Sequence, residues 1–160
     1  MSRQTALFVR AGQVISLVEV AGGVGSRTDI PNLAGEMGVD LAVLLPTLEA
    51  AEMLGLVRVE DGDLFLTEEG LRFLETSKDK VKMLKDKLAG IEPFRTAIEL
   101  SSGRGGVTSR DVADSLAKRG IEWHYKTELN ESLVHILLIY WTIPARLLSY
   151  NGKSGRFRRV

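Results

Sequence analysis

The chain has 160 residues, of which 44% are hydrophobic and 26% are charged, so it has enough apolar material for a globular core. It has no cysteine, which excludes disulfide bonds, thiolate nucleophiles and cysteine-ligated metals and fits a reducing compartment. The first residues lack the apolar core of a signal peptide, and the longest apolar run, residues 133–143, has about half the length of a membrane span. We therefore expect a cytoplasmic protein that does not insert into a membrane.

Opposite charges are concentrated in the two halves of the chain. Residues 1–75 contain five basic and twelve acidic residues, whereas residues 76–160 contain sixteen basic and nine acidic ones. The formal net charge of zero is therefore a balance between a negative and a positive half. Such an asymmetry indicates either a second half that binds anions or two halves that attract each other.

Residues 5–75 begin with the pattern of a helix-turn-helix. Asp29 is expected to cap a second helix that has Pro31 in its first turn, and Asp40 is expected to cap a third helix over residues 41–54. The first helix is predicted from apolar residues at helical spacing, which are Leu7, Phe8, Ala11, Val14, Ile15 and Val18.

The clearest local pattern predicts a β-hairpin after the third helix. Two stretches typical of strands, Val57–Glu60 and Asp63–Leu66, flank the dipeptide Asp61-Gly62. Asp-Gly is favoured in two-residue hairpin turns because both turn positions need positive φ. Thr67 is then expected to cap a helix, with two acidic residues near its positive end. Three helices followed by a hairpin are the order of a winged helix.

The helix after Thr67 is predicted to be long and to connect two units. Its apolar residues alternate spacings of three and four, which makes a heptad-like seam, and lysines cover its other faces. We interpret the seam as the face with which a connector packs along the protein, and the alternative is a seam between the two chains of a homodimer. The seam consists of Leu74, Ser77, Val81, Leu84, Leu88 and Ile91.

The same order of elements then repeats. Pro93 starts a helix, a glycine-rich break follows, and Thr108 or Ser109 caps the next helix. A third, very apolar helix covers about residues 127–141, and residues 146–160 have the pattern of a second hairpin.

These patterns predict a mainly α fold with small β wings, which is an α+β class. Tandem winged-helix units are joined by a long helix in this prediction. The first unit covers residues 1–75, the connecting helix covers residues 76–91, and the second unit covers residues 92–160.

The residue patterns that catalysis or metal binding would need are missing from the sequence. Only two histidines occur, His124 and His135, without an H-E-x-x-H spacing, and the apolar surroundings of His135 favour a hydrogen-bonded core residue. There is no G-x-S-x-G motif. The loop Gly103–Thr108 resembles a phosphate loop but lacks its lysine, so a simple connection is favoured over an anion site. We expect no catalytic residue, no cofactor and no metal.

Nucleic-acid binding is a candidate function for such a fold, because the third helix of a helix-turn-helix enters the major groove and the wing touches phosphates. In the first unit, this surface would repel phosphates, since its third helix has no lysine or arginine. Its acidic residues are instead candidates for facing a protein partner, and the alternative is that they only keep an exposed face solvated. These residues are Glu49, Glu52, Glu60, Asp61 and Asp63.

The second unit has a basic wing, which makes it the candidate for binding a nucleic acid or another anion. Its third helix offers mostly Glu128, Glu131 and apolar side chains and lacks the residue set that reads base edges. A basic wing is equally suited to an acidic protein surface. The basic residues of this wing are Lys153, Arg156, Arg158 and Arg159.

One group of motifs resembles a known family. The motifs are Leu44-Leu45-Pro46, residues 49–57 (EAAEMLGLV), residues 60–63 (EDGD), Leu66-Thr67 and Gly70, followed by the looser set Trp141, Ala145, Leu148, Tyr150 and Gly155. Together they resemble the AAA-associated C-terminal domain. That domain is found after the ATP-binding cassette in ATPase subunits of nitrate-, sulfonate-, taurine- and bicarbonate-type ABC transporters.

The resemblance implies an accessory, regulatory module beside a transporter ATPase, and it carries over no catalytic residues. The chain begins at a methionine with no cassette before it and has no Walker motif, so we expect it to act on an ATPase subunit in trans or to stand alone. Our leading hypothesis is a non-enzymatic regulatory protein-interaction module. The alternative is a winged-helix DNA-binding transcriptional regulator that uses the basic second unit.

Overall fold

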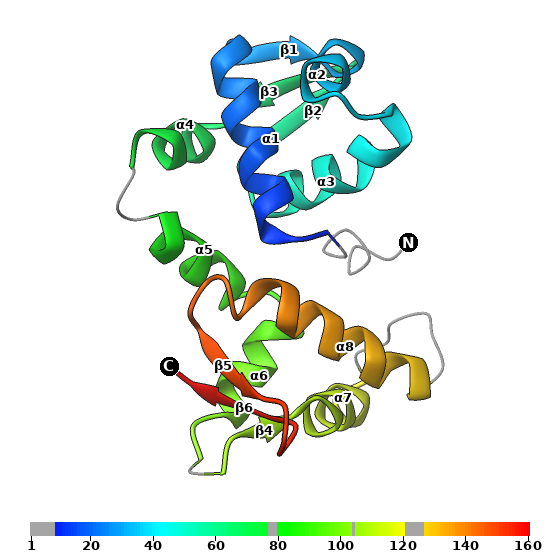
Figure 1. Cartoon of the computed structure of the whole chain (residues 1–160), viewed down its shortest axis with the longest axis vertical. Helices are drawn as coiled ribbons and strands as arrows, with labels where there is room; N and C mark the ends of the chain where they lie inside the picture. Colours follow the sequence, from blue (N-terminus) through cyan, green and yellow to red (C-terminus); the bar gives the residue numbers. More distant parts are fainter. Residues whose placement is uncertain (1–8, 77–79, 104, 121–126) are drawn as a thin grey trace. The chain divides into compact units, whose positions relative to one another are not determined.

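Figure 1 shows the computed structural model of the chain, which describes residues 9–76, 80–103, 105–120 and 127–160. The backbone divides into two compact units between Lys80 and Val81. Each unit combines helices with one small antiparallel sheet, so the protein has the α+β class that the sequence predicts. Within the described ranges, no helix has the length and apolar character needed to cross a membrane.

The first unit places its sheet beside four helices (Figure 1). Its first helix, α1, contacts the other three helices and supplies the centre of the core with Val14, Leu17 and Val18, all fully buried. In chain order the elements are α1 (Ala11–Val24), β1 (Arg27–Asp29), α2 (Ile30–Met37), α3 (Leu41–Met53), β2 (Val57–Glu60), β3 (Asp63–Leu66) and α4 (Glu68–Glu75).

The predicted start of α2 and the predicted hairpin are confirmed. Asp29 Oδ1 accepts a hydrogen bond from the amide of Asn32 at 2.7 Å, which is the expected cap of α2. Strands β2 and β3 pair from Val57 opposite Leu66 to Glu60 opposite Asp63. The turn residue Asp61 has φ of 49°, as a two-residue turn of this kind requires.

Two details of the first unit differ from the expectations, and a third expectation concerns residues that the structure does not describe. A third strand, β1, pairs antiparallel with β3 and places Arg27 opposite Phe65. Asp40 precedes α3 as expected, but its side chain makes no capping hydrogen bond. The residues Leu7 and Phe8, which the apolar pattern assigned to the first helix, lie outside the described residues.

The predicted long connecting helix is wrong. Helix α4 ends at Glu75, where Thr76 turns to an extended conformation with φ of −97° and ψ of 92°. Helix α5 (Lys80–Leu88) is a separate element, and Ser77 of the predicted seam lies outside the described residues. The apolar spacing continued across this break, and spacing alone does not reveal an extended residue between two helices.

The second unit repeats the order of the first. Its elements after α5 are α6 (Phe94–Leu100), β4 (Val107–Thr108), α7 (Ser109–Lys118), α8 (Thr127–Trp141), β5 (Leu148–Asn151) and β6 (Arg156–Arg159). Thr108 is the cap of α7, because its hydroxyl accepts from the amide of Asp111 and the Asp111 carboxylate accepts from the amide of Thr108. The sheet order β4-β6-β5 corresponds to β1-β3-β2 in the first unit.

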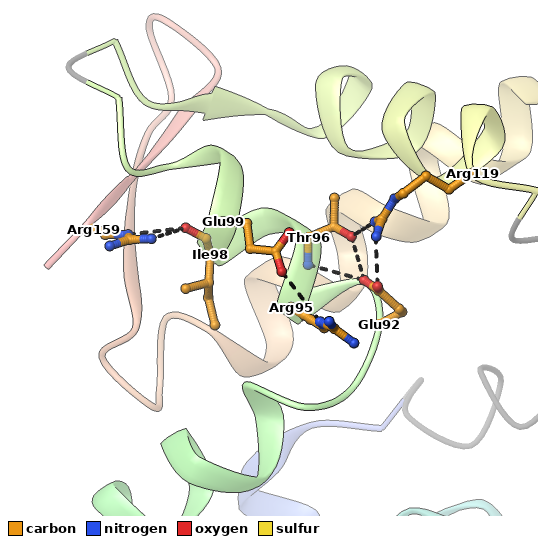
Figure 2. Close-up of polar contacts among 7 residues, drawn as sticks. All are labelled: Glu92, Arg95, Thr96, Ile98, Glu99, Arg119 and Arg159. Carbon is orange, nitrogen blue, oxygen red and sulfur yellow. Dashed lines mark hydrogen bonds and ion pairs between the residues drawn. The ribbon is translucent and has the colours of Figure 1, made fainter.

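A polar cluster joins the start of α6 to the end of α7, as Figure 2 shows. The carboxylate of Glu92 accepts hydrogen bonds from the amide and the hydroxyl of Thr96, the latter at 2.7 Å. Arg119, which follows α7, donates to the Thr96 hydroxyl and lies 3.5 Å from the other carboxylate oxygen of Glu92. Because Thr96 is 1% exposed, these bonds satisfy a hydroxyl that water does not reach.

Candidate interaction surfaces

The acidic wing of the first unit is largely neutralised by its own arginines. Arg27 Nη2 lies 2.8 Å from Asp63 Oδ2, and Arg58 Nε lies 2.8 Å from Glu60 Oε2. The two guanidinium groups also stand over the ring of Phe65, at 5.2 and 4.7 Å from its centroid. Of the acids predicted to face a partner, Asp63 and Glu60 therefore contact arginines of the same sheet.

Asp61 is one of the two residues that form the turn of the wing. It is exposed, and it holds the positive φ that the two-residue turn needs. A backbone role of this kind explains an aspartate at this position without a partner.

The exposed side of α3 carries a stripe of two leucines and two glutamates, which we call the α3 stripe: Leu41, Leu45, Glu49 and Glu52. These residues are three or four positions apart, so they share one face of the helix. Leu41 and Leu45 are 44% and 43% exposed. In the part of the chain that the structure describes, the carboxylates of Glu49 and Glu52 have no hydrogen bond and no ion pair. The stripe is therefore a surface on which apolar area and free negative charge lie together.

A shallow apolar groove lies between α1, the end of α2 and α3. We call it the α1–α3 groove, and its volume is about 230 Å³. Its most exposed large side chain is Val43, at 53%. The lining residues are Gly12, Gln13, Ser16, Met37, Val39, Val43, Leu44 and Thr47.

The basic hairpin of the second unit divides into residues with structural roles and residues with free charge. Arg159 donates two hydrogen bonds to the carbonyl of Ile98, as Figure 2 shows, with its Nη2 at 2.6 Å. Arg156 Nη1 donates to the carbonyl of Gly105 at 3.3 Å. Among the described residues, the side chains of Lys153 and Arg158 have no such partner. These last two are the hairpin cations available to an anion.

The remaining sequence candidates do not form a chemical site. The Nδ1 of His135 lies 2.8 Å from the hydroxyl of Ser109, so its predicted hydrogen bond is confirmed, but the side chain is half-buried and not fully in the core. The rings of Tyr150 and Phe157 pack against it. His124 lies outside the described residues, and the described ones contain no cluster of three metal-ligating side chains.

In the glycine-rich segment before β4, the amide of Gly106 donates to the carbonyl of Gly103 at 3.3 Å. Gly106 has φ of 72°, and a Cβ there would collide with the carbonyl of Phe157. Gly106 thus allows a close approach to β6, and this role in the connection explains the glycine at that position.

Sequence reasoning found Glu49 and Glu52 but missed the leucines of the α3 stripe and the whole α1–α3 groove. The apolar pattern of α3 runs around the helix, so counting hydrophobic residues does not separate Leu44, which is buried, from Leu45, which is exposed. One sequence signal was present, since the thirty residues between Arg27 and Arg58 contain five acids and no lysine or arginine.

Comparison with known proteins gives one match. The family model described as the C-terminal AAA-associated domain matches residues 31–151, which include both sheets except strands β1 and β6. No curated protein and no solved structure matches the chain.

Proposed function

The chain belongs to the C-terminal AAA-associated domain family, and from this premise we propose that it is a non-enzymatic module that regulates an ABC-transporter ATPase by direct protein contact. The family places such a module beside an ATPase. We also propose that the chain contacts the ATPase in trans, that this contact changes ATPase activity, and that the chain itself catalyses no reaction.

We further propose that both units are winged helices. The order helix, strand, helix, helix, strand, strand occurs twice, and each sheet joins the hairpin to the strand that follows the first helix of that order. In such a unit α3 and α8 occupy the place of the helix that contacts a partner. A surface on α3 is thus at the position that this fold uses for recognition.

The α3 stripe is the observation that carries the proposal. Exposed apolar side chains that lie together on one face offer a surface that a protein partner can cover, and Leu41 and Leu45 lie one turn apart on the same face of α3. Glu49 and Glu52 extend the same face and keep phosphates away, so the surface suits a protein and opposes a nucleic acid. Interfaces combine an apolar centre with a charged rim in this way.

The test is the affinity of the chain for an ABC-transporter ATPase from the same organism. We expect binding at micromolar concentration or tighter, and a loss of about tenfold when Glu49→Lys and Glu52→Lys reverse the charge of the stripe. The matched control is Glu68→Lys with Glu75→Lys, which makes the same change of charge on exposed positions of α4. The absence of binding to such an ATPase at any accessible concentration rules the proposal out.

A DNA-binding regulator remains the second candidate because of the free cations on the second hairpin. No acidic residue occurs between Ser132 and Val160, and the side chains of Lys153 and Arg158 point to no partner among the described residues. Against it, the described exposed side of α8 offers Glu131, Ser132 and Ile136, and none of these is basic. Duplex affinity that falls steeply with salt, with a smaller slope after Lys153→Ala and Arg158→Ala, would favour this candidate.

A further inference from the structure

The α1–α3 groove has the size and character of an anchor pocket. Sites for drug-sized ligands and cofactors enclose about 300–1,000 Å³, whereas this groove holds about 230 Å³ and opens to solvent. Its walls are mostly apolar, with Met37, Val39 and Val43 on the α2–α3 side. A space of this kind accommodates one large apolar side chain of a partner, which is the usual form of a binding hot spot.

The charges around the groove are arranged asymmetrically. Glu36 and Asp40 are exposed and adjoin Met37 and Val39, which line the groove. Within the described residues neither carboxylate has a hydrogen bond or ion pair, and Asp40 does not use its side chain to cap α3. The basic residue nearest in sequence to the lining, Arg10, precedes α1. The exposed charged residues that directly flank the groove lining in the chain on the α2–α3 side are therefore both acidic, which is complementary to a cation.

We propose that the α1–α3 groove receives a basic segment of the partner protein, which inserts one large apolar side chain and places a lysine or arginine beside Glu36 and Asp40. This inference rests on the proposed function, because it names the chemistry of the segment through which the module is bound. The apolar anchor supplies most of the affinity, and the two carboxylates select a basic over an acidic segment.

Gly12 provides a variant that closes the groove with little disturbance of the fold. It lies in α1, lines the groove, and has nothing within 4 Å of the place where a Cβ would stand. Gly12→Ala should leave the groove open and favour the helix, whereas Gly12→Phe places a ring where the anchor would lie. The two variants keep the charge of the protein and differ in whether the groove is free.

The experiment measures the binding of three synthetic fluorescent peptides to the full chain by fluorescence anisotropy. One peptide combines leucine with lysine, the second has glutamate in place of lysine, and the third has alanine in place of leucine. We expect binding of the leucine–lysine peptide alone, weakened about tenfold or more by Gly12→Phe and unchanged by Gly12→Ala. Glu36→Gln with Asp40→Asn should weaken it severalfold, because both carboxylates lose their charge.

Four results would overturn the inference. Equal binding to the Gly12→Ala and Gly12→Phe proteins would place the peptide elsewhere, and equal binding of the alanine–lysine peptide would reduce the effect to general attraction of charge. If the chain self-associates and Gly12→Phe abolishes that self-association, a second copy of the chain occupies the α1–α3 groove. If the ATPase binds the Gly12→Phe protein as tightly as the unchanged one, the groove inference fails while the proposed function stands. If the peptide binds as expected but no ATPase does, the proposed function fails.

Discussion

Arg159, in the last strand, donates two hydrogen bonds to the carbonyl of Ile98, which lies 61 positions earlier in the chain and in the last turn of α6. Carbonyls in the last turn of a helix lack partners within the helix, and a cation near them is favoured by the helix dipole. An arginine that the sequence suggests for anion binding therefore holds the end of a helix.

Replacing Arg159 should lower the stability of the second unit. We expect Arg159→Ala to decrease the free energy of unfolding by about 1–2 kcal/mol, since the lost hydrogen bonds have a charged donor. Arg158→Ala removes the same charge from the neighbouring position and should change it by less than about 0.5 kcal/mol. Urea unfolding of both variants checks the difference. If both variants lose the same free energy of unfolding, the positive charge stabilises the unit and the contact with Ile98 does not.

Gly70 in α4 should tolerate no larger residue. A Cβ at this position would collide with the carbonyl of Leu56, so the start of α4 approaches the residue before β2 closer than alanine permits. We expect Gly70→Ala to destabilise the first unit by about 1–3 kcal/mol. Gly35 in α2 has open space around it, and Gly35→Ala should stabilise by up to about 1 kcal/mol. Thermal unfolding measures both, and a Gly70→Ala protein as stable as the Gly35→Ala protein would contradict the close approach.

The hydroxyl of Thr96 should matter more than its methyl group. Thr96→Val keeps the shape but leaves Glu92 and Arg119 without the hydroxyl that both contact, at a cost of about 1–3 kcal/mol. Thr96→Ser retains the hydroxyl and should cost about 1 kcal/mol or less for the lost methyl group. The measurement is chemical unfolding of the two variants. If the serine variant is the less stable of the two, packing of the methyl group contributes more to stability at this position than the hydrogen bonds of the hydroxyl.

The local signals of the sequence were sufficient where one or two residues determine a backbone geometry. Asp61-Gly62 predicted the turn of the first hairpin, and Thr67 accepts the amide of Gly70 as a cap should. Strands β1 and β4 were missed because they are three and two residues long and are held by pairing with distant strands. Their residues alone carry no strand pattern.

The candidate surfaces were predictable only in their charge. The acidic character of α3 could be read from Glu49 and Glu52, but the pairing of Asp63 with Arg27 depends on β1 lying beside β3. The exposure of Leu45 beside the buried Leu44 depends on which side of α3 faces α1. Tertiary contacts decide both questions. They neutralise part of the negative charge of the wing, and they leave the α3 stripe exposed as the candidate surface.

The most direct test of the account is site-specific photo-cross-linking of the full chain to an ABC-transporter ATPase. A photoreactive residue is placed at Leu45, in the α3 stripe, or at Arg158, on the basic hairpin, and the products are mapped by mass spectrometry. We predict cross-links to the ATPase from position 45 that disappear with Glu49→Lys and Glu52→Lys. Cross-links from position 158 alone, or cross-links at 45 that survive the reversal of charge, would contradict it.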